Sequence, residues 1–480
     1  MSETSERSRL GKALLRPDRV AIVGASGDLQ KNNSRPQRYL AKHGYRGTVY
    51  PVNPNATEIL GLPAYASLAA CPEPPEHAYV MVGARSVESV IRDCAAAGVQ
   101  VATIFSGGFA EAGDEGRERQ ARIVAEARAH GVRLIGPNSL GVFNTHWPLT
   151  LSANAVLERE RLPRGPIGLV SQSGSMIGAL VSRGESRGVA FSSLVSIGNE
   201  CDLSVGEVAD LLVDDPETRV ILLFLETLRD APRLEAMARR AEAAGKPILA
   251  YVLGRSDLGR ALAQTHTGAM VGGGRSLEAF LDDIGIIRLD TFESLIEAPQ
   301  LVMGRGRAKG RRVAIATTTG GAAALVADRV GERGIEVVAP TPALRAGLAP
   351  FKIEVGEGPI VDLTMAGTRP EVVDTVMQEL MADPRVDAIV MAVGSSAEYR
   401  PELVVTPLVK WARAAKPVVA FLLPNAERSL RLLAEAGIAG FRTPEACADA
   451  LAGYLAWRAP RRPEALDSPE AARRLLAQAT

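Results

Sequence analysis

The chain contains an internal repeat, which constrains its fold more than any other feature of the sequence. Residues 167–175 form an apolar run that passes through Ser and Gly into a helical stretch, and residues 313–321 align with them without a gap. Each copy then continues to an Arg-Gly pair, at Arg187 and Arg333. Self-similarity of this kind indicates a duplicated structural unit. We therefore expect two related domains.

The two copies stay aligned further along the chain. Asp215 and Asp383 each precede a Pro and an apolar run, and Lys246 and Lys416 each precede a Pro and another apolar run. Apolar runs that alternate with helical stretches are typical of parallel sheets covered by helices. The repeat therefore predicts two flavodoxin-like α/β domains, separated by a basic, glycine-rich linker at residues 304–310.

A further α/β unit precedes the repeat. Its expected strands lie at residues 19–23, 48–52, 79–82, 101–105 and 133–135, with a helix near Arg35. The first strand leads into a Gly-Ala-Ser-Gly turn, which is typical of nucleotide-binding Rossmann-type domains. We expect a Rossmann-type domain over residues 1–147, flavodoxin-like domains over 160–303 and 311–458, and a tail over 459–480.

Composition excludes several classes of protein. A length of 480 residues exceeds one ordinary core, and the balance of 55 basic and 55 acidic residues gives no electrostatic reason to expect nucleic acid or a membrane surface as partner. The 4 cysteines are scattered, without a CxxC pair, which argues against a disulfide framework and a metal site. No apolar stretch has the length of a membrane span or signal sequence, so we expect a cytoplasmic protein.

In both copies of the repeat, a strand ends in small residues and leads directly into a helix. The first backbone N–H groups of a helix have no intrahelical partner, and together with the helix dipole they favour bound phosphate. The candidate phosphate-binding residues are Ser171, Ser173, Gly174 and Ser175 in the first copy and Gly320 and Gly321 in the second.

The two copies differ where chemistry is expected. Glu226 ends an apolar run in the first copy, whereas the second copy has Gly394 at that place. Only the first copy continues into a small-residue segment that contains His266, one of 5 histidines. An imidazole nitrogen can accept a phosphoryl group and pass it on. The pattern therefore predicts a phosphate-carrying His266, with Glu226 at the sheet edge where open α/β sheets bind ligands.

Several motifs together resemble the NDP-forming acyl-CoA synthetases, the family that includes ADP-forming acetyl-CoA synthetase and the more distant succinyl-CoA synthetase. These motifs lie at residues 23–26, 35–36, 50–54, 106–113, 136–141, 171–174, 198–200 and 265–269. The resemblance extends over nearly the whole chain. It implies an N-terminal Rossmann-type CoA-binding domain followed by two succinyl-CoA synthetase-like flavodoxin domains.

The resemblance also implies residue roles. His266 would carry phosphate, Glu226 would orient it, and helices that start after Gly174 and Gly320 would flank it. Asn138 would join the phosphate-binding residues. The implied CoA-binding residues are Gly24, Ala25, Ser26, Gly27, Arg35, Asn53, Pro54, Phe105, Ser106 and Gly107.

The implied reaction converts acyl-CoA, ADP and phosphate into a carboxylic acid, CoA and ATP, through an acyl phosphate and a phosphohistidine. Such enzymes exchange the phosphate with ATP or ADP and Mg²⁺ on an ATP-grasp module, for which no length of chain remains here. We therefore expect an ATP-grasp partner subunit or domain, an oligomeric assembly and no resident metal. Ser468 opens a stretch that looks like the start of the ATP-grasp region in fused relatives, so both a natural subunit and a truncated fused enzyme fit.

Two other classes of function stay open. A non-catalytic CoA-binding regulatory protein fits the lack of two lysines that relatives often carry, one near residues 55–57 and one before Gly254. A nicotinamide-dependent dehydrogenase fits the turn at Gly24, although the GxGxxG fingerprint is incomplete. The nucleophile-elbow arrangement of a hydrolase is not present around Ser171. Retention of both His266 and Glu226 favours the ligase subunit.

Overall fold

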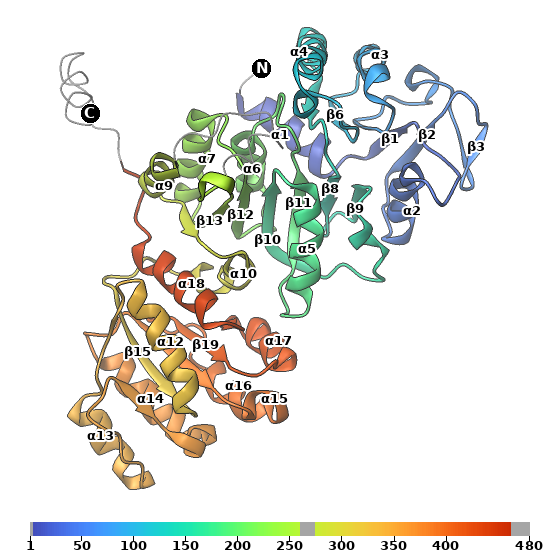
Figure 1. Ribbon diagram of the computed structural model, residues 1–480. Coiled ribbons are helices and arrows are strands. Elements are labelled where there is room, and N and C mark those ends of the chain that lie inside the picture. Colours follow the sequence, from blue (N-terminus) through green and yellow to red (C-terminus); the bar gives the residue numbers. More distant parts are fainter. Residues whose placement is uncertain (1–2, 260–273, 462–480) are drawn as a thin grey trace, which may run out of the picture.

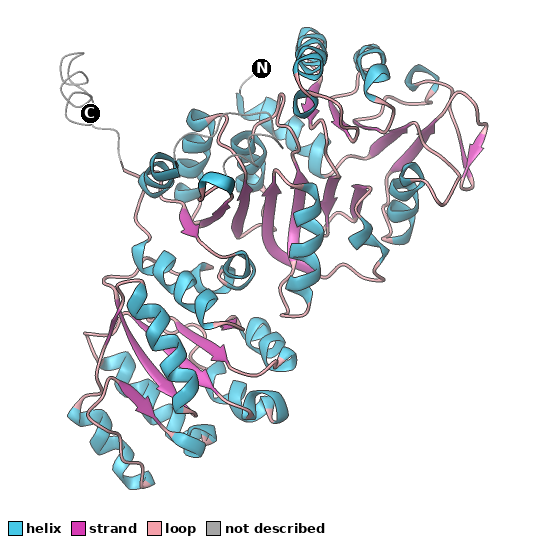
Figure 2. Ribbon diagram, viewed as in Figure 1, coloured by secondary structure: helices cyan, strands magenta, loops and turns pink. Residues whose placement is uncertain are grey.

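Three large β-sheets organise the chain, which we describe from a computed structural model over residues 3–259 and 274–461 (Figure 1). Helices pack on the sheets, as the colouring by secondary structure shows (Figure 2). The α/β fold class predicted from the sequence is confirmed. Two predicted features, His266 and the tail from Ser468, lie outside the described residues.

The first sheet has the strand order β2-β1-β5-β6-β7, and its strands are parallel. The predicted strands at 19–23, 48–52 and 133–135 have the predicted bounds. The strands are β1 (Arg19–Val23), β2 (Thr48–Val52), β5 (His77–Val80), β6 (Val101–Ile104) and β7 (Arg133–Ile135), and a small hairpin pairs β3 (Glu58–Ile59) with β4 (Leu62–Pro63). The helices are α2 (Arg35–Lys42), α3 (Ala84–Ala96) and α4 (Asp114–Ala129), with short 3₁₀ helices η1 (Asn32–Ser34), η2 (Leu68–Ala70) and η3 (Ala110–Ala112).

Strand β1 lies between β2 and β5, so the chain crosses to opposite sides of it in successive connections. This is the topological switch point of the sheet, and ligands of open α/β sheets bind outside the carboxyl ends of the strands there. The Gly-Ala-Ser-Gly turn that begins at Gly24 follows β1 directly. The fold therefore places the predicted CoA-binding turn at the expected edge.

The second sheet has the order β14-β13-β12-β10-β11-β8-β9, with parallel pairing from β14 to β11 and an antiparallel hairpin, β8 and β9, added at one edge. Its strands are β8 (Gly141–Asn144), β9 (Leu149–Ser152), β10 (Arg164–Ser171), β11 (Phe191–Ser196), β12 (Val220–Leu225), β13 (Ile248–Val252) and β14 (Ile287–Leu289). Its helices are α5 (Gly174–Glu185), α6 (Val205–Asp214), α7 (Ala231–Ala243), α9 (Gly274–Asp283), α10 (Phe292–Glu297) and α11 (Pro299–Val302), and η4 is Ala155–Glu158. Strand β8 pairs with β11 of this sheet, although it lies before residue 147, the predicted end of the first domain. That domain boundary stays a prediction.

The third sheet has the order β16-β15-β18-β19-β20, and β17 also pairs with β15. This order matches β11-β10-β12-β13-β14 of the second sheet, as the sequence repeat predicts. Its strands are β15 (Arg312–Thr317), β16 (Glu336–Val337), β17 (Ile360–Asp362), β18 (Ala388–Val393), β19 (Val418–Leu422) and β20 (Ala439–Phe441). Its helices are α12 (Gly320–Glu332), α13 (Pro342–Leu348), α14 (Pro370–Ala382), α15 (Ser396–Tyr399), α16 (Pro401–Val409), α17 (Glu427–Ala436) and α18 (Pro444–Ala456), with η5 at Ala349–Phe351 and η6 at Thr364–Thr368.

The repeated lysines have the same structural role in both copies. Lys246 Nζ donates hydrogen bonds to the carbonyl oxygens of Leu212 (3.3 Å) and Asp215 (2.6 Å), at the end of α6. Lys416 Nζ donates to Leu380 O (3.0 Å) and Asp383 O (2.5 Å), at the end of α14. A cation near the carboxyl end of a helix satisfies its last carbonyls and opposes the helix dipole. The lysines of the repeat are therefore structural.

One continuous hydrophobic core joins the second and third sheets. Buried side chains of α5, α10, α12 and α18, such as Leu180, Leu295, Val326 and Leu451, belong to the same cluster. Figure 1 shows α18 and α10 lying between the two sheets. Because both halves of the repeat bury apolar surface against each other, this interface fixes their relative position.

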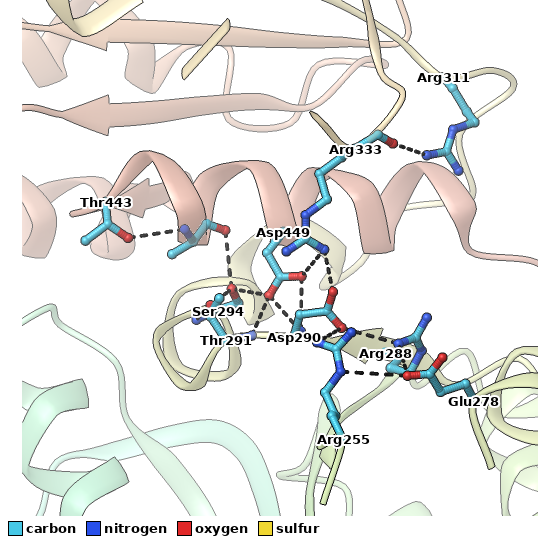
Figure 3. Close-up of polar contacts among 11 residues, drawn as sticks. Arg255, Glu278, Arg288, Asp290, Thr291, Ser294, Arg311, Arg333, Thr443 and Asp449 are labelled. Carbon is cyan, nitrogen blue, oxygen red and sulfur yellow. Dashed lines mark hydrogen bonds and ion pairs between the residues drawn. The ribbon is translucent and has the colours of Figure 1, made fainter. Parts of the chain in front are cut away.

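Charged side chains cross this interface beside the apolar core (Figure 3). Asp449 of α18, only 1% exposed, accepts hydrogen bonds from the backbone N–H groups of Asp290 (2.8 Å) and Thr291 (2.9 Å) and from Ser294 Oγ (2.6 Å). Arg333 contacts the carboxylates of Asp290 (2.6 Å) and Asp449 (3.1 Å). A carboxylate from the last helix of the third sheet thus binds the backbone just before α10.

The N-terminal helix α1 (Glu3–Leu15) connects the first two sheets. Lys12 of α1 pairs with Glu76 (3.2 Å), just before β5 of the first sheet. On the side of the second sheet, Asn144 Nδ2 of β8 donates to Leu15 O (3.1 Å), and Arg7 of α1 pairs with Asp214 at the end of α6 (2.8 Å). Within the described residues, we find no helix with the length and apolar character needed to cross a membrane.

Candidate functional site

Gly24 begins the turn at the end of β1 and has a backbone that only glycine adopts readily. Its φ is +84°, and a Cβ at this position would lie 3.1 Å from Met81 O. At Gly27, in contrast, a Cβ would meet nothing within 4 Å. The turn therefore packs closely on β5 at one end and faces open space at the other. The sequence-predicted residues Ala25 and Ser26 lie between these glycines.

Two asparagines hold this turn against its neighbours. Asn53 Nδ2 donates to Ala25 O (2.9 Å), which joins the residues after β2 to the turn after β1. Asn33 Nδ2 donates to both Gly24 O (2.8 Å) and Met81 O (2.9 Å). Asn53 and the adjacent Pro54 were predicted from the resemblance. Asn33 was not, because its role depends on η1 folding back onto the strand ends.

The loop after β6 contains Phe105, Ser106 and Gly107, and the structure brings it to the same edge as Gly24. Phe105 N–H donates to Val80 O (3.0 Å), which continues the pairing with β5. Ser106 Oγ is buried and has no hydrogen-bond partner among the described residues. A buried hydroxyl without a partner is costly, and a bound polar ligand would satisfy it. The residues present at this edge therefore fit a phosphate-bearing cofactor such as CoA.

Arg35 is the first residue of α2 and lies beside this edge. Its guanidinium donates to Ala153 O (3.2 Å), a residue that follows β9 of the second sheet. The half-buried Arg35 thus supplies positive charge where the first two sheets meet. An arginine there is suited to pair with phosphate.

The first phosphate cradle, residues 171–175, lies between β10 and α5. Ser171 Oγ donates to Ser173 O (2.6 Å) and accepts from Ser173 N–H (3.2 Å), so one hydroxyl closes the turn. Ser173 Oγ lies 3.3 Å from Ser175 Oγ at the start of α5. The arrangement presents two hydroxyls and the first N–H groups of α5 at one point. Groups of this kind favour a bound anion, and phosphate binding here stays a prediction.

The second cradle repeats this turn in the third sheet. Thr317 Oγ1 donates to Thr319 O (2.7 Å) and accepts from Thr319 N–H (3.0 Å), and α12 then begins at Gly320. Gly320 and Gly321 are exposed at the start of α12. No hydrogen bond between described residues joins this cradle to residues 171–175. The structure therefore places the two predicted cradles in equivalent positions of two sheets.

Asn138 lies between the CoA loop and the first cradle. Its N–H donates to Ser106 O (3.0 Å), and its φ of +61° turns the chain sharply. Two residues later, Leu140 packs so closely on Gly174 that a Cβ there would lie 2.7 Å from Leu140 Cγ. The segment from Asn138 to Leu140 thus connects the loop that contains Ser106 with the start of α5. The side chain of Asn138 itself is exposed.

Glu226 follows β12 at the carboxyl edge of the second sheet and is 5% exposed. The side chain of Gln172, within the first cradle, fixes its backbone: Gln172 Oε1 accepts from the N–H groups of Glu226 (2.5 Å) and Thr227 (2.9 Å). Glu226 is therefore buried next to the cradle, not at the surface. The contribution of Gln172 was not predicted from the sequence.

The described residues contain no group of three or more His, Cys, Asp or Glu side chains that could hold a metal ion. The cysteines Cys71, Cys94, Cys201 and Cys447 are all unpaired.

Comparison with known proteins agrees with this geometry. Residues 18–145 match the family described as "CoA binding domain", and residues 164–302 match "Succinyl-CoA ligase like flavodoxin domain". These matches define the class of protein: a CoA-binding domain joined to a ligase-type flavodoxin domain. The chain belongs to the NDP-forming acyl-CoA synthetase family, in its CoA-binding, alpha-subunit part.

Relatives and a solved structure carry this assignment over most of the chain. A trans-feruloyl-CoA synthase from an unknown prokaryotic organism is 34% identical over 79% of this chain and 54% of its own length. The alpha subunit of ADP-forming acetate–CoA ligase II of Pyrococcus furiosus is 29% identical over 89% of this chain and 94% of its own. The chain thus spans about half of the first relative and nearly all of the second.

The structure of acetyl-coenzyme A synthetase 1 of Candidatus Korarchaeum cryptofilum, in complex with phosphate and ADP, superposes with a TM-score of 0.80. It is 27% identical and covers 93% of this chain and 96% of its own. The named relatives include ADP-forming acetate–CoA ligases, which are acid–thiol ligases. The fold and the family predicted from the sequence are confirmed.

Proposed function

We propose that this chain is the CoA-binding, phosphohistidine-forming subunit of an ADP-forming acyl-CoA ligase. The observation that carries the proposal is the contact between Asn138 N–H and Ser106 O, next to Leu140 and Gly174. This contact supports the proposal because it links the loop at residues 105–107 to the start of α5, where we propose that CoA and phosphate bind. An acyl thioester held by one and a phosphate held by the other would then meet.

In the first step, a phosphate oxygen attacks the thioester carbonyl, the carbon–sulfur bond breaks, and CoA leaves as its thiolate. The product is an acyl phosphate. The N–H groups at the start of α5 and the hydroxyls of Ser173 and Ser175 would hold the phosphate for this attack. A helix N-terminus stabilises an anion by about 1–2 kcal/mol in a partly buried site, so positioning supplies most of the rate.

In the second step, a ring nitrogen of His266 attacks phosphorus, the bond from phosphorus to the acyl oxygen breaks, and the carboxylate leaves. His266 lies outside the described residues, and its role is proposed from the sequence motif and the family. Glu226 would hold the imidazole in the orientation and tautomer that leave the attacking nitrogen unprotonated. Gly320 and Gly321 would offer a second helix N-terminus to the phosphohistidine.

The remaining step, transfer of the phosphate to ADP, needs a nucleotide site. We assign it to an ATP-grasp subunit or domain that brings ATP or ADP with Mg²⁺, in an oligomeric assembly. Small carboxylic acids and their CoA thioesters are the proposed substrates, and neither nucleic acid nor membrane is a proposed partner. CoA and ATP are cytoplasmic metabolites and the described cysteines are unpaired, which supports a cytoplasmic location.

Release of free CoA tests the proposal. The purified chain is mixed with phosphate, Mg²⁺ and a panel of acyl-CoA thioesters, and the thiol released is measured with a chromogenic disulfide. We expect a burst of CoA stoichiometric with the chain for the correct thioester. His266→Ala can still release CoA in the first step, but it should retain no phosphate, because His266 acts only in the second step. CoA binding without a burst, even after addition of an ATP-grasp subunit, would favour a non-catalytic CoA-binding regulatory protein instead.

A further inference from the structure

Gln172 uses every hydrogen-bonding group of its side chain in a single network at the catalytic edge. Its Oε1 accepts from the N–H groups of Glu226 and Thr227, and its Nε2 donates to Thr227 O (2.9 Å) and to Glu200 Oε2 (2.7 Å). The other oxygen of Glu200 accepts from Val205 N–H (2.6 Å) at the start of α6. An amide whose two ends are both engaged cannot rotate without losing these bonds.

Glu200 is held equally firmly. It is 9% exposed and sits in a turn with a left-handed backbone, φ +55°. The preceding residue, Asn199, donates from its N–H to Pro137 O (2.9 Å) and from its side chain to Glu111. Glu200 is therefore a fixed buried carboxylate between α6 and the cradle.

The second half of the repeat allows this network to be compared with its duplicate. Ile197 N–H donates to Ser171 O (2.8 Å) as Leu363 N–H donates to Thr317 O (2.9 Å), and the next residues, Gly198 and Thr364, both have left-handed φ. The turns therefore begin alike, and counting from them Glu200 corresponds to Ala366, although of these two residues only Glu200 has a left-handed φ.

The other members of the network change in the same way. Gln172 N–H donates to Phe224 O (3.1 Å) as Thr318 N–H donates to Ala392 O (3.0 Å), so Gln172 corresponds to Thr318. Thr318 Oγ1 accepts from Gly394 N–H (3.0 Å), at the position of Glu226. The first half of the repeat, which has Glu226, thus also has the Gln172–Glu200 pair. In the second half, which has Gly394 at that position, the corresponding contact is a single hydrogen bond to the Thr318 hydroxyl.

We propose that Gln172 and Glu200 are positioning residues that hold the backbone of Glu226 in place for phosphoryl transfer to His266. The inference rests on the proposed function, since it assigns the network a purpose in that reaction. Glu200 fixes the orientation of the Gln172 amide, and the amide fixes Glu226. Neither side chain is required to touch the substrate.

Reversing the hydrogen-bond polarity tests the pair. In Glu200→Gln, an NH₂ group would face Gln172 Nε2 unless one amide turns, which would break the contact with Val205 or with Glu226. In Gln172→Glu, two carboxylates would face each other. The double variant Gln172→Glu/Glu200→Gln keeps an acceptor toward Glu226 N–H and restores a donor–acceptor pair between the two side chains, although it lacks the donor to Thr227 O. Glu207→Gln, which neutralises the carboxylate of the nearby α6 capping box, is the matched control.

Two readouts are compared for these four proteins: the rate of acyl-CoA-dependent phosphorylation, and hydrogen exchange at the amides of Glu226 and Thr227. We expect each single variant to slow phosphorylation roughly ten- to a hundredfold, because small misplacements of catalytic groups have effects of this size. We also expect faster exchange at both amides and unchanged CoA affinity. The double variant should regain most of both properties, and Glu207→Gln should match the wild type.

Wild-type rates and exchange in the single variants would overturn the inference. So would a double variant whose losses are the sum of the two single losses, because the pair would then not be coupled. If the wild type accepts no phosphate from any thioester, but the single variants still exchange faster at Glu226 and Thr227, the proposed function fails while the structural link stands.

Discussion

At the scale of single residues, the proposed site is assembled from side chains that bind backbone rather than substrate. Asn33 holds the turn at Gly24 in the proposed CoA site, and Gln172 holds Glu226 in the proposed phosphate site. Both asparagine and glutamine offer a donor and an acceptor on one rigid group, so a single side chain can join two strand ends. These side chains hold the loops at the ends of the strands in place, while the loops themselves stay at the edge of the sheet.

Glu200 gives a pH-dependence with a definite sign. The pKa of Glu200 is raised from 4.5 to about 7, mainly by burial and also by the charge of Asp230. The hydrogen bonds from Val205 and Gln172 and the charge of Arg229 lower the pKa and offset part of this rise. Between these two pKa values the folded protein keeps a proton that the unfolded chain has released. The contribution of Glu200 to stability is therefore greatest below about pH 4.5 and falls as the pH rises toward 7.

This loss of stability with rising pH should be absent from Glu200→Gln, because the glutamine side chain does not titrate. Thermal midpoints of the wild type and the variant, measured from pH 5 to pH 8, are expected to move in favour of the variant as the pH rises. A difference between the two midpoints that stays constant across this range would show that the folded-state pKa of Glu200 is close to its usual value.

At the scale of secondary-structure elements, the start of α5 is far more tightly packed than the start of α12. A Cβ at Gly174 would lie 2.7 Å from Leu140 Cγ and 2.9 Å from Ser196 Oγ, whereas one at Gly321 would meet nothing within 4 Å. We expect Gly174→Ala to lower the free energy of unfolding by about 1–3 kcal/mol, as overpacking typically does. Gly321→Ala is the control for stability.

Gly321→Ala should be neutral or stabilising by up to about 1 kcal/mol, because alanine restricts the unfolded chain and favours a helix. Denaturant unfolding of both variants measures the difference. Equal destabilisation at the two positions would contradict the packing described at Gly174.

The lysines of the repeat give a paired prediction. Lys246→Met and Lys416→Met each remove two hydrogen bonds to carbonyl oxygens at a helix end and keep the aliphatic part of the side chain. We expect each to lower the free energy of unfolding by about 1–2 kcal/mol. A large effect at one site and none at the other, in thermal or denaturant unfolding, would argue against equivalent roles.

Many of the secondary-structure elements could be predicted from the sequence, because local patterns of apolar residues and glycines determine them. Strand β1 and the turn at Gly24 follow from local apolar runs and glycines, and the repeat itself fixes the order of the second and third sheets. The hairpin β8–β9 was not predicted, because its membership of the second sheet depends on pairing with β11, nearly fifty residues later. Glu200 was predicted only as part of the motif at residues 198–200. Its contact with Gln172 and the contact of Asn33 with Met81 were not predicted, because only the folded chain brings these residues together.

At the scale of the whole molecule, the interface between the two halves of the repeat combines an apolar core with buried charge. Asp449 binds the backbone just before α10 and pairs with Arg333, and Arg333 also contacts Asp290. Arg255, which follows β13, contacts Asp290 as well (2.8 Å). The same cluster therefore ties the end of a strand in the second sheet to the last helix of the third (Figure 3).

Asp449→Ala should weaken this interface. It leaves the N–H groups of Asp290 and Thr291 without their acceptor, while Arg333 keeps its pair with Asp290, so we expect a loss of about 1–3 kcal/mol. Glu445→Ala on the same helix is the control, since its pair with Arg329 is exposed and contributes little to stability. Thermal unfolding and proteolysis of the linker at residues 304–310 measure the difference, and equal behaviour of the two variants would contradict the role of Asp449.

The central claim is that the chain carries phosphate on His266. Intact-mass spectrometry after incubation with phosphate, Mg²⁺ and a panel of acyl-CoA thioesters tests it most directly, with His266→Ala as control and peptide mapping to locate the modification. The account predicts one added phosphate on the wild type, mapped to His266, and none on the variant. A phosphate that maps elsewhere, or equal labelling of the variant, would contradict it.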